Sequence, residues 1–382
     1  MTDFPKATFV QYSDAQRLAA LRQRISYAAQ RSPFYREHLG ALPLPETLDA
    51  LSTLPFTSPE DINRQGRRMV CVPGSEVARI VSLPSSGTTG PAKRLHFTEG
   101  DLLRTVDFFA EGMAWMCGAG DRVGIFMPGE SPNGISDLLS RGLGKIGVQS
   151  IHYGLISDFE TLIPRLEREK PTVLVGIPWQ LRRLCLSMPS LRPHTVLLSA
   201  DYSPAGLDGL LEQIWGCRVL EHFGMTETGY GCAVEHPEHK GMFLRRDEFI
   251  AEIIDPHSGT VLPHGEMGEL VLTTLRREAM PLIRYRTGDW AKMADSYRIE
   301  CICGRVSQPR EVYALQDALC PLPWLCEFRE IEGRIVASVG PSAPENCAED
   351  LSSICSRPVE LHRLSSPAEL GIHNGKRPLP NR

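Results

Sequence analysis

The strongest constraint on the fold is an alternation of short apolar runs and amphipathic helical patterns across residues 123–221. The apolar runs occupy 123–127, 149–153, 173–177, 195–199 and 218–221. This alternation predicts parallel strands joined by crossover helices. The runs are rich in Val, Leu and Ile, which indicates strands buried on both faces. We therefore expect an α/β fold built on a mostly parallel sheet.

Ligands of such sheets bind beyond the carboxyl ends of the strands, so the residues at those ends are candidates for a site. They include His152, Tyr153, Gly154, Trp179, Ser199, Ala200, Asp201 and His222. Phe126, Tyr153 and Trp179 would enclose the ring of a ligand bound there. Packing in the core explains these aromatic side chains equally well.

A polar loop follows a predicted strand at 79–83. Over 85–93 it gathers four hydroxyl side chains, two glycines and a lysine. Glycine lets backbone N–H groups turn toward a phosphate, and the lysine adds a positive charge. The alternative is an ordinary surface loop of the same composition. The spacing Gly-x-x-Gly-x-x-Lys does not match the loop of P-loop nucleotidases.

A second glycine pattern, Gly-x-Gly-x-x-Gly, occupies 142–147. A dinucleotide-binding fingerprint follows a strand and opens a helix. Here the pattern follows a predicted helix at 135–143, so we interpret it as a helix end.

After about residue 249 the pattern changes to strands at 250–254 and 269–274, separated by a turn at 255–259. This predicts a small β-barrel-like subdomain at about 250–300. Beyond residue 305 the sequence is weakly patterned until 334–339.

Composition limits the class of protein. With a net charge of −5, the chain has no overall positive charge that would attract nucleic acid or an anionic membrane. No secretory signal is evident, and no apolar run approaches the ~20 residues that span a bilayer. The 11 cysteines are scattered, which favours reduced thiols. We expect a cytoplasmic protein that binds neither nucleic acid nor membrane.

Three segments, 85–93, 222–227 and 285–289, occur in the order and spacing of the adenylate-forming superfamily, which the chain resembles. Segments 32–36, 54–57 and 280–289 are typical of its phenylacetate-CoA ligase branch, and the resemblance covers about 15–310. It implies an N-terminal domain at 1–313, with parallel sheets flanked by helices and the β-rich part. A shortened α+β C-terminal domain at 314–382 would follow.

The resemblance also implies the roles of individual residues. Thr226 would contact the α-phosphate of ATP, Glu227 would ligate Mg²⁺, and Asp289 would bind the ribose. Residues 199–201 would line the adenine, and His222 and Phe223 would flank the adenine and the acyl group. The nucleotide-binding set is Ser85, Ser86, Gly87, Thr88, Thr89, Gly90, Lys93, Ser199, Ala200, Asp201, His222, Phe223, Gly224, Met225, Thr226, Asp289 and Arg305. The acyl pocket would use Phe126, His152, Tyr153, Gly154 and Trp179.

The implied reaction activates a small, aromatic carboxylic acid with ATP. The acid would become an acyl-adenylate with release of pyrophosphate, and the thiol of coenzyme A would then displace AMP. One alternative hands the acyl group to a carrier protein or an amine. Another is a nucleotide-binding relic without catalysis. A homodimer is a further expectation.

The chain departs from the branch pattern near its end. Arg305 belongs to a degenerate hinge motif that lacks the usual acids, and Asp317 is the one candidate hinge acid nearby. From Ala318 onward the sequence has 65 residues, whereas the small domain of the resembled family usually has ~100. Lys376 resembles the family's near-terminal lysine, which assists adenylation, but a solvated terminal lysine is the simpler alternative.

A structural zinc site is a further expectation from the resemblance. Cys301 and Cys303 resemble a Cys-x-Cys-Gly of part of the branch, and His236 and His239 would complete a tetrahedral set. The alternative is a pair of reduced cysteines near surface histidines.

Overall fold

The computed structural model describes residues 12–83, 93–238, 241–331 and 334–365. Its chain divides into two compact units, and each unit is made of two segments. Unit 1 combines Met1–Trp115 with Phe223–Ser307, and unit 2 combines Met116–His222 with Gln308–Arg382. The boundary predicted between 313 and 314 falls inside helix α9 (Arg310–Leu319) and stays a prediction.

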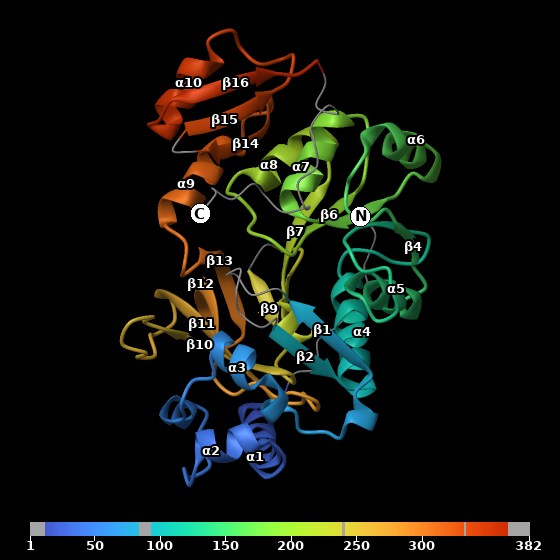
Figure 1. Ribbon diagram of the computed structural model, residues 1–382. Coiled ribbons are helices and arrows are strands. Elements are labelled where there is room, and N and C mark those ends of the chain that lie inside the picture. Colours follow the sequence, from blue (N-terminus) through green and yellow to red (C-terminus); the bar gives the residue numbers. More distant parts are fainter. Residues whose placement is uncertain (1–11, 84–92, 239–240, 332–333, 366–382) are drawn as a thin grey trace. The chain divides into compact units, whose positions relative to one another are not determined.

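Unit 2 contains the predicted parallel sheet. Its strand order is β4-β3-β5-β6-β7, with every neighbouring pair parallel. These strands are β3 (Arg122–Phe126), β4 (Gln149–His152), β5 (Val173–Gly176), β6 (Thr195–Leu198) and β7 (Arg218–Phe223). The connecting helices are α5 (Ile135–Lys145), α6 (Phe159–Glu169), α7 (Pro178–Ser187) and α8 (Leu207–Trp215), as Figure 1 shows. The predicted α/β class is confirmed. Helix α5 ends inside the second glycine pattern, so that pattern is a helix end as interpreted.

Unit 1 begins with helical elements and a hairpin. They are α1 (Asp14–Arg31), α2 (Pro33–Leu39), η1 (Asp49–Thr53), α3 (Pro59–Met69), η2 (Gly74–Glu76), β1 (Arg79–Leu83), β2 (Lys93–Phe97) and α4 (Glu99–Met113). Strands β1 and β2 pair antiparallel on either side of the predicted phosphate loop. Because β2 begins at Lys93, the hairpin holds this lysine at the end of that loop.

The rest of unit 1 contains the β-rich region predicted at about 250–300, and two further strands precede it. Its antiparallel order is β10-β11-β12-β13-β9-β8. The elements are η3 (Thr226–Thr228), β8 (Ala233–Glu235), β9 (Met242–Leu244), β10 (Phe249–Ile254), β11 (Met267–Thr274), β12 (Tyr285–Asp295) and β13 (Arg298–Arg305). Alternating burial along β12 marks a strand with one face in the core.

The C-terminal segment of unit 2 forms its own small α+β layer, drawn in orange and red in Figure 1. It contains α9, β14 (Leu325–Ile331), β15 (Arg334–Val339), α10 (Cys347–Cys355) and β16 (Val359–Arg363). The strand order is β14-β15-β16, with β15 and β16 parallel. The segment has the α+β character predicted for it.

A buried arginine joins this segment to helix α7. Arg182 is fully buried and donates to the carbonyl oxygens of Cys320 at 2.9 Å, Leu322 at 2.6 Å and Leu325 at 2.5 Å. These carbonyls lie at and just beyond the C-terminal end of α9, where helix carbonyls lack partners and the helix dipole is negative. One buried side chain therefore caps α9 from the parallel-sheet part of the unit.

Hydrophobic packing continues across the same contact. Phe126, Leu198 and Trp215 share one buried cluster with Phe328 and Ile335 of the C-terminal strands. The rings of Trp179 and Phe328 meet edge to face, with centroids 5.8 Å apart. The C-terminal segment thus shares the core of the parallel sheet.

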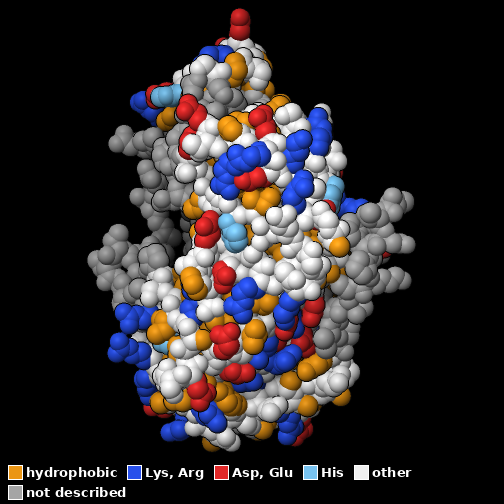
Figure 2. Space-filling view, turned by 90° about the vertical axis from the view of Figure 1, so that its right-hand side faces the viewer, with side chains coloured by type: hydrophobic (Ala, Val, Ile, Leu, Met, Phe, Trp, Pro, Cys, Tyr) orange, Lys and Arg blue, Asp and Glu red, His pale blue; other side chains and the backbone are white. Residues whose placement is uncertain are grey.

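Charges of both signs are interspersed on the face drawn in Figure 2, with no field of a single sign. None of the described helices has the length and apolar character needed to cross a membrane.

Candidate functional site

Three side chains of unit 1 from distant parts of the sequence form a polar cluster. Lys93 Nζ lies 2.6 Å from Glu227 Oε1 and donates to the Tyr285 hydroxyl at 3.4 Å. The Tyr285 hydroxyl donates to the same Glu227 oxygen at 3.2 Å. The side chains of Lys93 and Glu227 are 16% and 7% exposed, so this ion pair is largely shielded from water. The structure thus brings together two residues that the sequence placed in one site.

Tyr285 is the member that sequence reasoning missed. It is fully buried, and burial together with the negative charge of Glu227 raises the pKa of its phenol well above the ordinary value. The phenol therefore keeps its proton and acts as a donor to Glu227. Its position as the first residue of the recognised segment 285–289 was the available signal, but its contact with Glu227 is tertiary.

A tight turn presents Glu227. Met225 O accepts from the N–H groups of Thr228 at 3.0 Å and Tyr230 at 2.9 Å, and Gly229 N donates to Thr226 O at 3.1 Å. Gly229 has φ +83°, a left-handed conformation that glycine adopts without a steric penalty. Thr226 is partly exposed and Glu227 is buried. Phe223, Gly224 and Met225 precede them and are partly exposed.

Asp289 and Arg305 form a second pair in unit 1. They are cross-strand partners on β12 and β13, and Arg305 Nη1 donates to Asp289 Oδ1 at 2.8 Å and to Thr287 O at 2.9 Å. Burial raises the pKa of Asp289 to about 6 in spite of the nearby Arg305. At neutral pH Asp289 is thus an oriented carboxylate, suited to accept hydrogen bonds from two neighbouring hydroxyl groups.

The predicted adenine segment lies in unit 2, directly after β6. Ser199 Oγ and His222 Nδ1 share a hydrogen bond of 2.8 Å. Burial lowers the pKa of His222 to about 4, so its ring is neutral at pH 7. Ala200 has φ +70°, which is uncommon for a residue with a Cβ and is a feature of functional loops. Asp201 follows it and is partly exposed.

The predicted acyl-pocket residues all lie in unit 2. Phe126 and Trp179 belong to the buried core, which agrees with the packing alternative. Tyr153 stacks on Phe126 with ring centroids 4.8 Å apart. His152 Nδ1 shares a hydrogen bond of 2.7 Å with Ser136 Oγ, and Gly154 has φ +70°. An acyl pocket at these residues stays a prediction.

The zinc ligands stay a prediction too. On β13 the sulfur atoms of Cys301 and Cys303 lie 2.9 Å apart. His236 packs against Trp115 and Phe243, with ring centroids 5.1 Å and 5.7 Å away. Within the described ranges no group of three or more His, Cys, Asp and Glu side chains could hold a metal ion. His239 lies outside those ranges.

Other predicted residues also lie outside the described part of the chain. They are Ser85, Ser86, Gly87, Thr88, Thr89, Gly90 and Lys376. Of the predicted phosphate loop at 85–93, Lys93 is therefore the one residue that the structure describes.

Comparison with known proteins identifies the family. The model of the AMP-binding enzyme family matches residues 80–275, which is half of the chain. The phenylacetate-coenzyme A ligase of Pseudomonas putida is 32% identical over 292 residues, 72% of this chain and 65% of that protein. The phenylacetate-coenzyme A ligase of Thermus thermophilus is 29% identical over 304 residues, 75% of this chain and 66% of that protein. The matched region thus spans slightly less than two thirds of these relatives.

The fold agrees with solved structures. A 2-hydroxyisobutyryl-CoA ligase in the postadenylation state, in complex with 2-HIB-AMP, superposes with a TM-score of 0.80 at 19% identity. The superposition covers 99% of this chain and 92% of the ligase. The chain belongs to the AMP-binding enzyme family and is similar to phenylacetate-coenzyme A ligases.

Proposed function

We propose that the protein activates a small aromatic carboxylic acid with Mg-ATP and transfers the acyl group to coenzyme A. The observation that carries the proposal is the contact of Lys93 with Glu227 at 2.6 Å, supported by Tyr285. This contact places the Lys93 ammonium group beside the Glu227 carboxylate, at the end of the glycine-rich loop. The chain that holds them belongs to the AMP-binding family.

In the first half-reaction an oxygen of the substrate carboxylate attacks the α-phosphorus of ATP. The new O–P bond forms as the bond to pyrophosphate breaks, and the products are acyl-adenylate and pyrophosphate. Two anions must approach, so Lys93 would hold and neutralise the phosphates while Thr226 donates to the α-phosphate. The preorganised charge of Lys93 costs little reorganisation during the step.

Glu227 fits the role of a magnesium ligand. It is a hard oxygen donor, buried, and directly beside the lysine of the phosphate loop. When bound, Mg²⁺ would offset the negative charge that develops on the phosphates and the leaving group. Tyr285 would keep the carboxylate oriented, because its hydroxyl donates to Oε1.

Two further groups would hold the nucleoside. Asp289, oriented by Arg305, would accept from the ribose hydroxyls. Ser199, Ala200 and Asp201, with the neutral His222, would line the adenine.

In the second half-reaction the thiol of coenzyme A would lose its proton to solvent and its sulfur would attack the acyl carbonyl carbon. The C–S bond would form as the C–O bond to AMP breaks, and AMP would leave. The aromatic substrate and the coenzyme A acceptor rest on similarity to proteins named phenylacetate-coenzyme A ligase.

An exchange of labelled pyrophosphate into ATP, screened over aryl and alkyl carboxylic acids, tests the proposal. Each active acid is then incubated with ATP and coenzyme A, and the thioester is measured by mass spectrometry. We expect exchange and acyl-CoA with aryl acids. Exchange without acyl-CoA would favour a carrier-protein or amine acceptor. Binding of ATP without exchange for any acid would favour a relic.

A further inference from the structure

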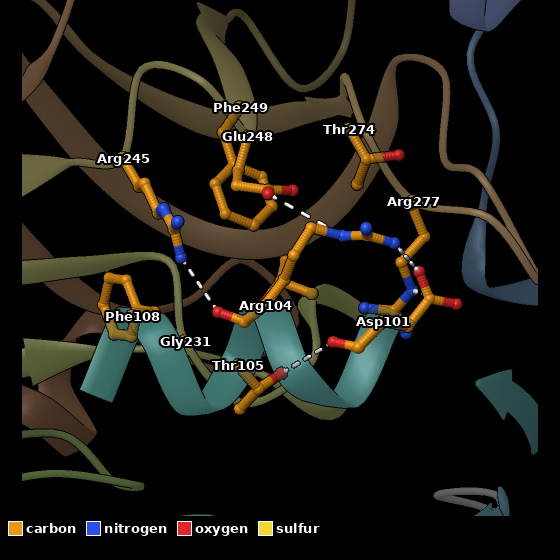
Figure 3. Close-up of a pocket in the computed structure, with 11 residues that line it drawn as sticks. Asp101, Arg104, Thr105, Phe108, Gly231, Arg245, Glu248, Phe249, Thr274 and Arg277 are labelled. Carbon is orange, nitrogen blue, oxygen red and sulfur yellow. Dashed lines mark hydrogen bonds and ion pairs between the residues drawn. The ribbon is translucent and has the colours of Figure 1, made fainter. Parts of the chain in front are cut away.

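A small polar hollow lies between helix α4 and the chain that follows the Glu227 turn. Asp101, Arg104, Thr105 and Phe108 of α4 line it, facing Gly231 and Arg277 (Figure 3). Its volume of about 20 Å³ is room for about one water molecule, so it is too small for a substrate. The hollow therefore has no room for a substrate, and its lining groups contact the neighbouring chain.

One contact from α4 reaches the turn itself. The Thr105 hydroxyl lies 2.7 Å from Gly229 O and 3.3 Å from Asp101 O. A hydroxyl has a single proton, and the shorter contact to Gly229 is the better hydrogen bond. Thr105 is only 6% exposed, so losing this bond would leave a buried carbonyl without its donor. Gly229 follows Glu227 by two residues.

The backbone of residues 229–231 is also packed tightly against neighbouring side chains of unit 1. A Cβ on Gly229 would lie 2.7 Å from Arg277 Nη1 and 3.1 Å from Thr105 Oγ1. A Cβ on Gly231 would lie 2.2 Å from the Phe108 ring. Tyr230 stacks on Phe97, with centroids 6.0 Å apart and planes 4° apart. The chain after Glu227 is thus packed directly against α4 and its neighbours.

Helix α4 is a fixed support for this contact. The Asp101 carboxylate accepts from the backbone N–H groups of Glu278 at 2.8 Å, Ala279 at 3.0 Å and Thr98 at 3.1 Å. Arg104 also donates to it, at 2.8 Å. This network joins the first turn of α4 to the segment before β12.

We propose that Thr105 is a positioning residue for Glu227. Its hydroxyl fixes the carbonyl of Gly229, and the short turn carries that restraint to the carboxylate that faces Lys93 and Tyr285. The inference rests on the proposed function, since it assumes that Glu227 holds Mg²⁺ beside ATP. Partners that orient a metal ligand commonly contribute tenfold or more to metal affinity.

The test compares Thr105→Val, which keeps the shape and removes the hydroxyl, with Thr105→Ser, which keeps the hydroxyl. Thr172→Val is the matched control, because Thr172 donates to Asp121 within unit 2. ATP binding is measured by calorimetry over a Mg²⁺ titration, and amide hydrogen exchange is followed in the peptide spanning 225–231. For Thr105→Val we expect about a tenfold higher Mg²⁺ requirement and faster exchange of this peptide. Thr105→Ser is expected to stay within about twofold of the wild type, and Thr172→Val to leave both readouts unchanged.

Wild-type Mg²⁺ dependence in Thr105→Val, or an equal loss in Thr105→Ser, would overturn the proposal. If Thr105→Val does not fold, Gly229→Ala is the second variant. Its Cβ would lie 2.7 Å from Arg277 Nη1, so we expect the clash to shift the Gly229 carbonyl. The variant is expected to raise the Mg²⁺ requirement, and an unchanged requirement would count against the proposal. Failure of the proposed function is separate, since the wild type itself would then show no pyrophosphate exchange with any acid. The hydrogen exchange of 225–231 would still show whether Thr105 holds the turn.

Discussion

Asp289 and Arg305 face each other across β12 and β13, with Arg305 Nη1 donating to the carboxylate at 2.8 Å. Asp289 is 7% exposed, and its burial raises its pKa to about 6 although a guanidinium is in contact. Removal from water therefore outweighs the attraction of the arginine. The carboxylate proposed to bind ribose gains its proton within an accessible pH range.

The first prediction is a pH dependence of ATP binding. Below pH 6 Asp289 becomes protonated and loses acceptor capacity, so the KM for ATP in pyrophosphate exchange should rise as the pH falls. At pH 5, one unit below the folded pKa, we expect an increase of about tenfold over the value at pH 7.5. Asp289→Asn should raise KM at pH 7.5 and flatten the profile between pH 5 and 7.5. An identical pH profile in Asp289→Asn would assign the titration to another group.

The second prediction concerns the ion pair of Lys93 and Glu227. Lys93→Ala removes the charge that would stabilise the phosphates, and Glu227→Ala removes the proposed metal ligand. Each should lower the rate of pyrophosphate exchange by about 10²-fold to 10³-fold. Circular dichroism should show folded proteins, because both side chains lie in a site rather than in the hydrophobic core. Exchange at the wild-type rate in either folded variant would refute the assigned role.

The third prediction concerns the role of Tyr285, as distinct from the roles of Lys93 and Glu227. Tyr285→Phe keeps the ring in its buried position and removes the donor to Glu227 Oε1. A single hydrogen bond to a charged group contributes about 1.5–3 kcal/mol, so kcat/KM should fall by about 10-fold to 100-fold. The loss should appear mainly at limiting Mg²⁺, since the carboxylate would be less well oriented. A loss that is independent of Mg²⁺ would indicate that Tyr285 acts on the core instead.

The sequence predicted the parallel sheet because its strands are apolar on both faces, a signal contained within each segment. It also placed Lys93 and Glu227 in recognisable motifs, and the structure brings these two side chains together. It did not predict the role of Arg182, because the partners of that side chain are backbone carbonyls that no residue type reveals. The strand β14 was missed because its Glu and Arg interrupt the apolar pattern. The interleaving of two units follows from tertiary packing, which local patterns do not encode.

The fourth prediction is a pH dependence of stability from Glu248, which is 8% exposed. Burial raises its pKa to about 7, although Arg245 and Arg104 partly oppose the shift. The folded state therefore binds this proton more tightly than the unfolded state. Its contribution is full below the unfolded pKa of about 4.5 and is lost as the pH rises toward 7. The loss is about 3 kcal/mol at most.

Glu248→Gln removes the titrating proton and is the matched variant for this effect. Free energies of unfolding from urea titrations at pH 5 and pH 8 measure it. The decrease from pH 5 to pH 8 should be smaller in Glu248→Gln than in the wild type. Equal decreases in both proteins would show that Glu248 does not titrate in this range.

The fifth prediction is that the segment after residue 308 stays attached to the parallel sheet throughout the reaction. Arg182 is fully buried and binds three carbonyls of that segment, and Asp317 accepts from Tyr202 Oη at 2.7 Å. Breaking such contacts leaves a buried charge without partners, at a cost of about 3–5 kcal/mol. If the segment moved away from α7, new contacts would therefore have to replace the ones that it lost.

A disulfide across the same contact tests this directly. A Cβ on Gly206 would lie 3.8 Å from the Cβ of Pro321, the mean separation in disulfides of about 3.8 Å. We expect Gly206→Cys with Pro321→Cys, once oxidised, to keep pyrophosphate exchange and acyl-CoA formation within about twofold of the reduced form, because the linked parts already share one core. Each single variant under the same oxidant controls for strain at Gly206, where φ is +83°. If oxidation abolished acyl-CoA formation but spared exchange, and reductant restored it, the segment would have to move between the two half-reactions.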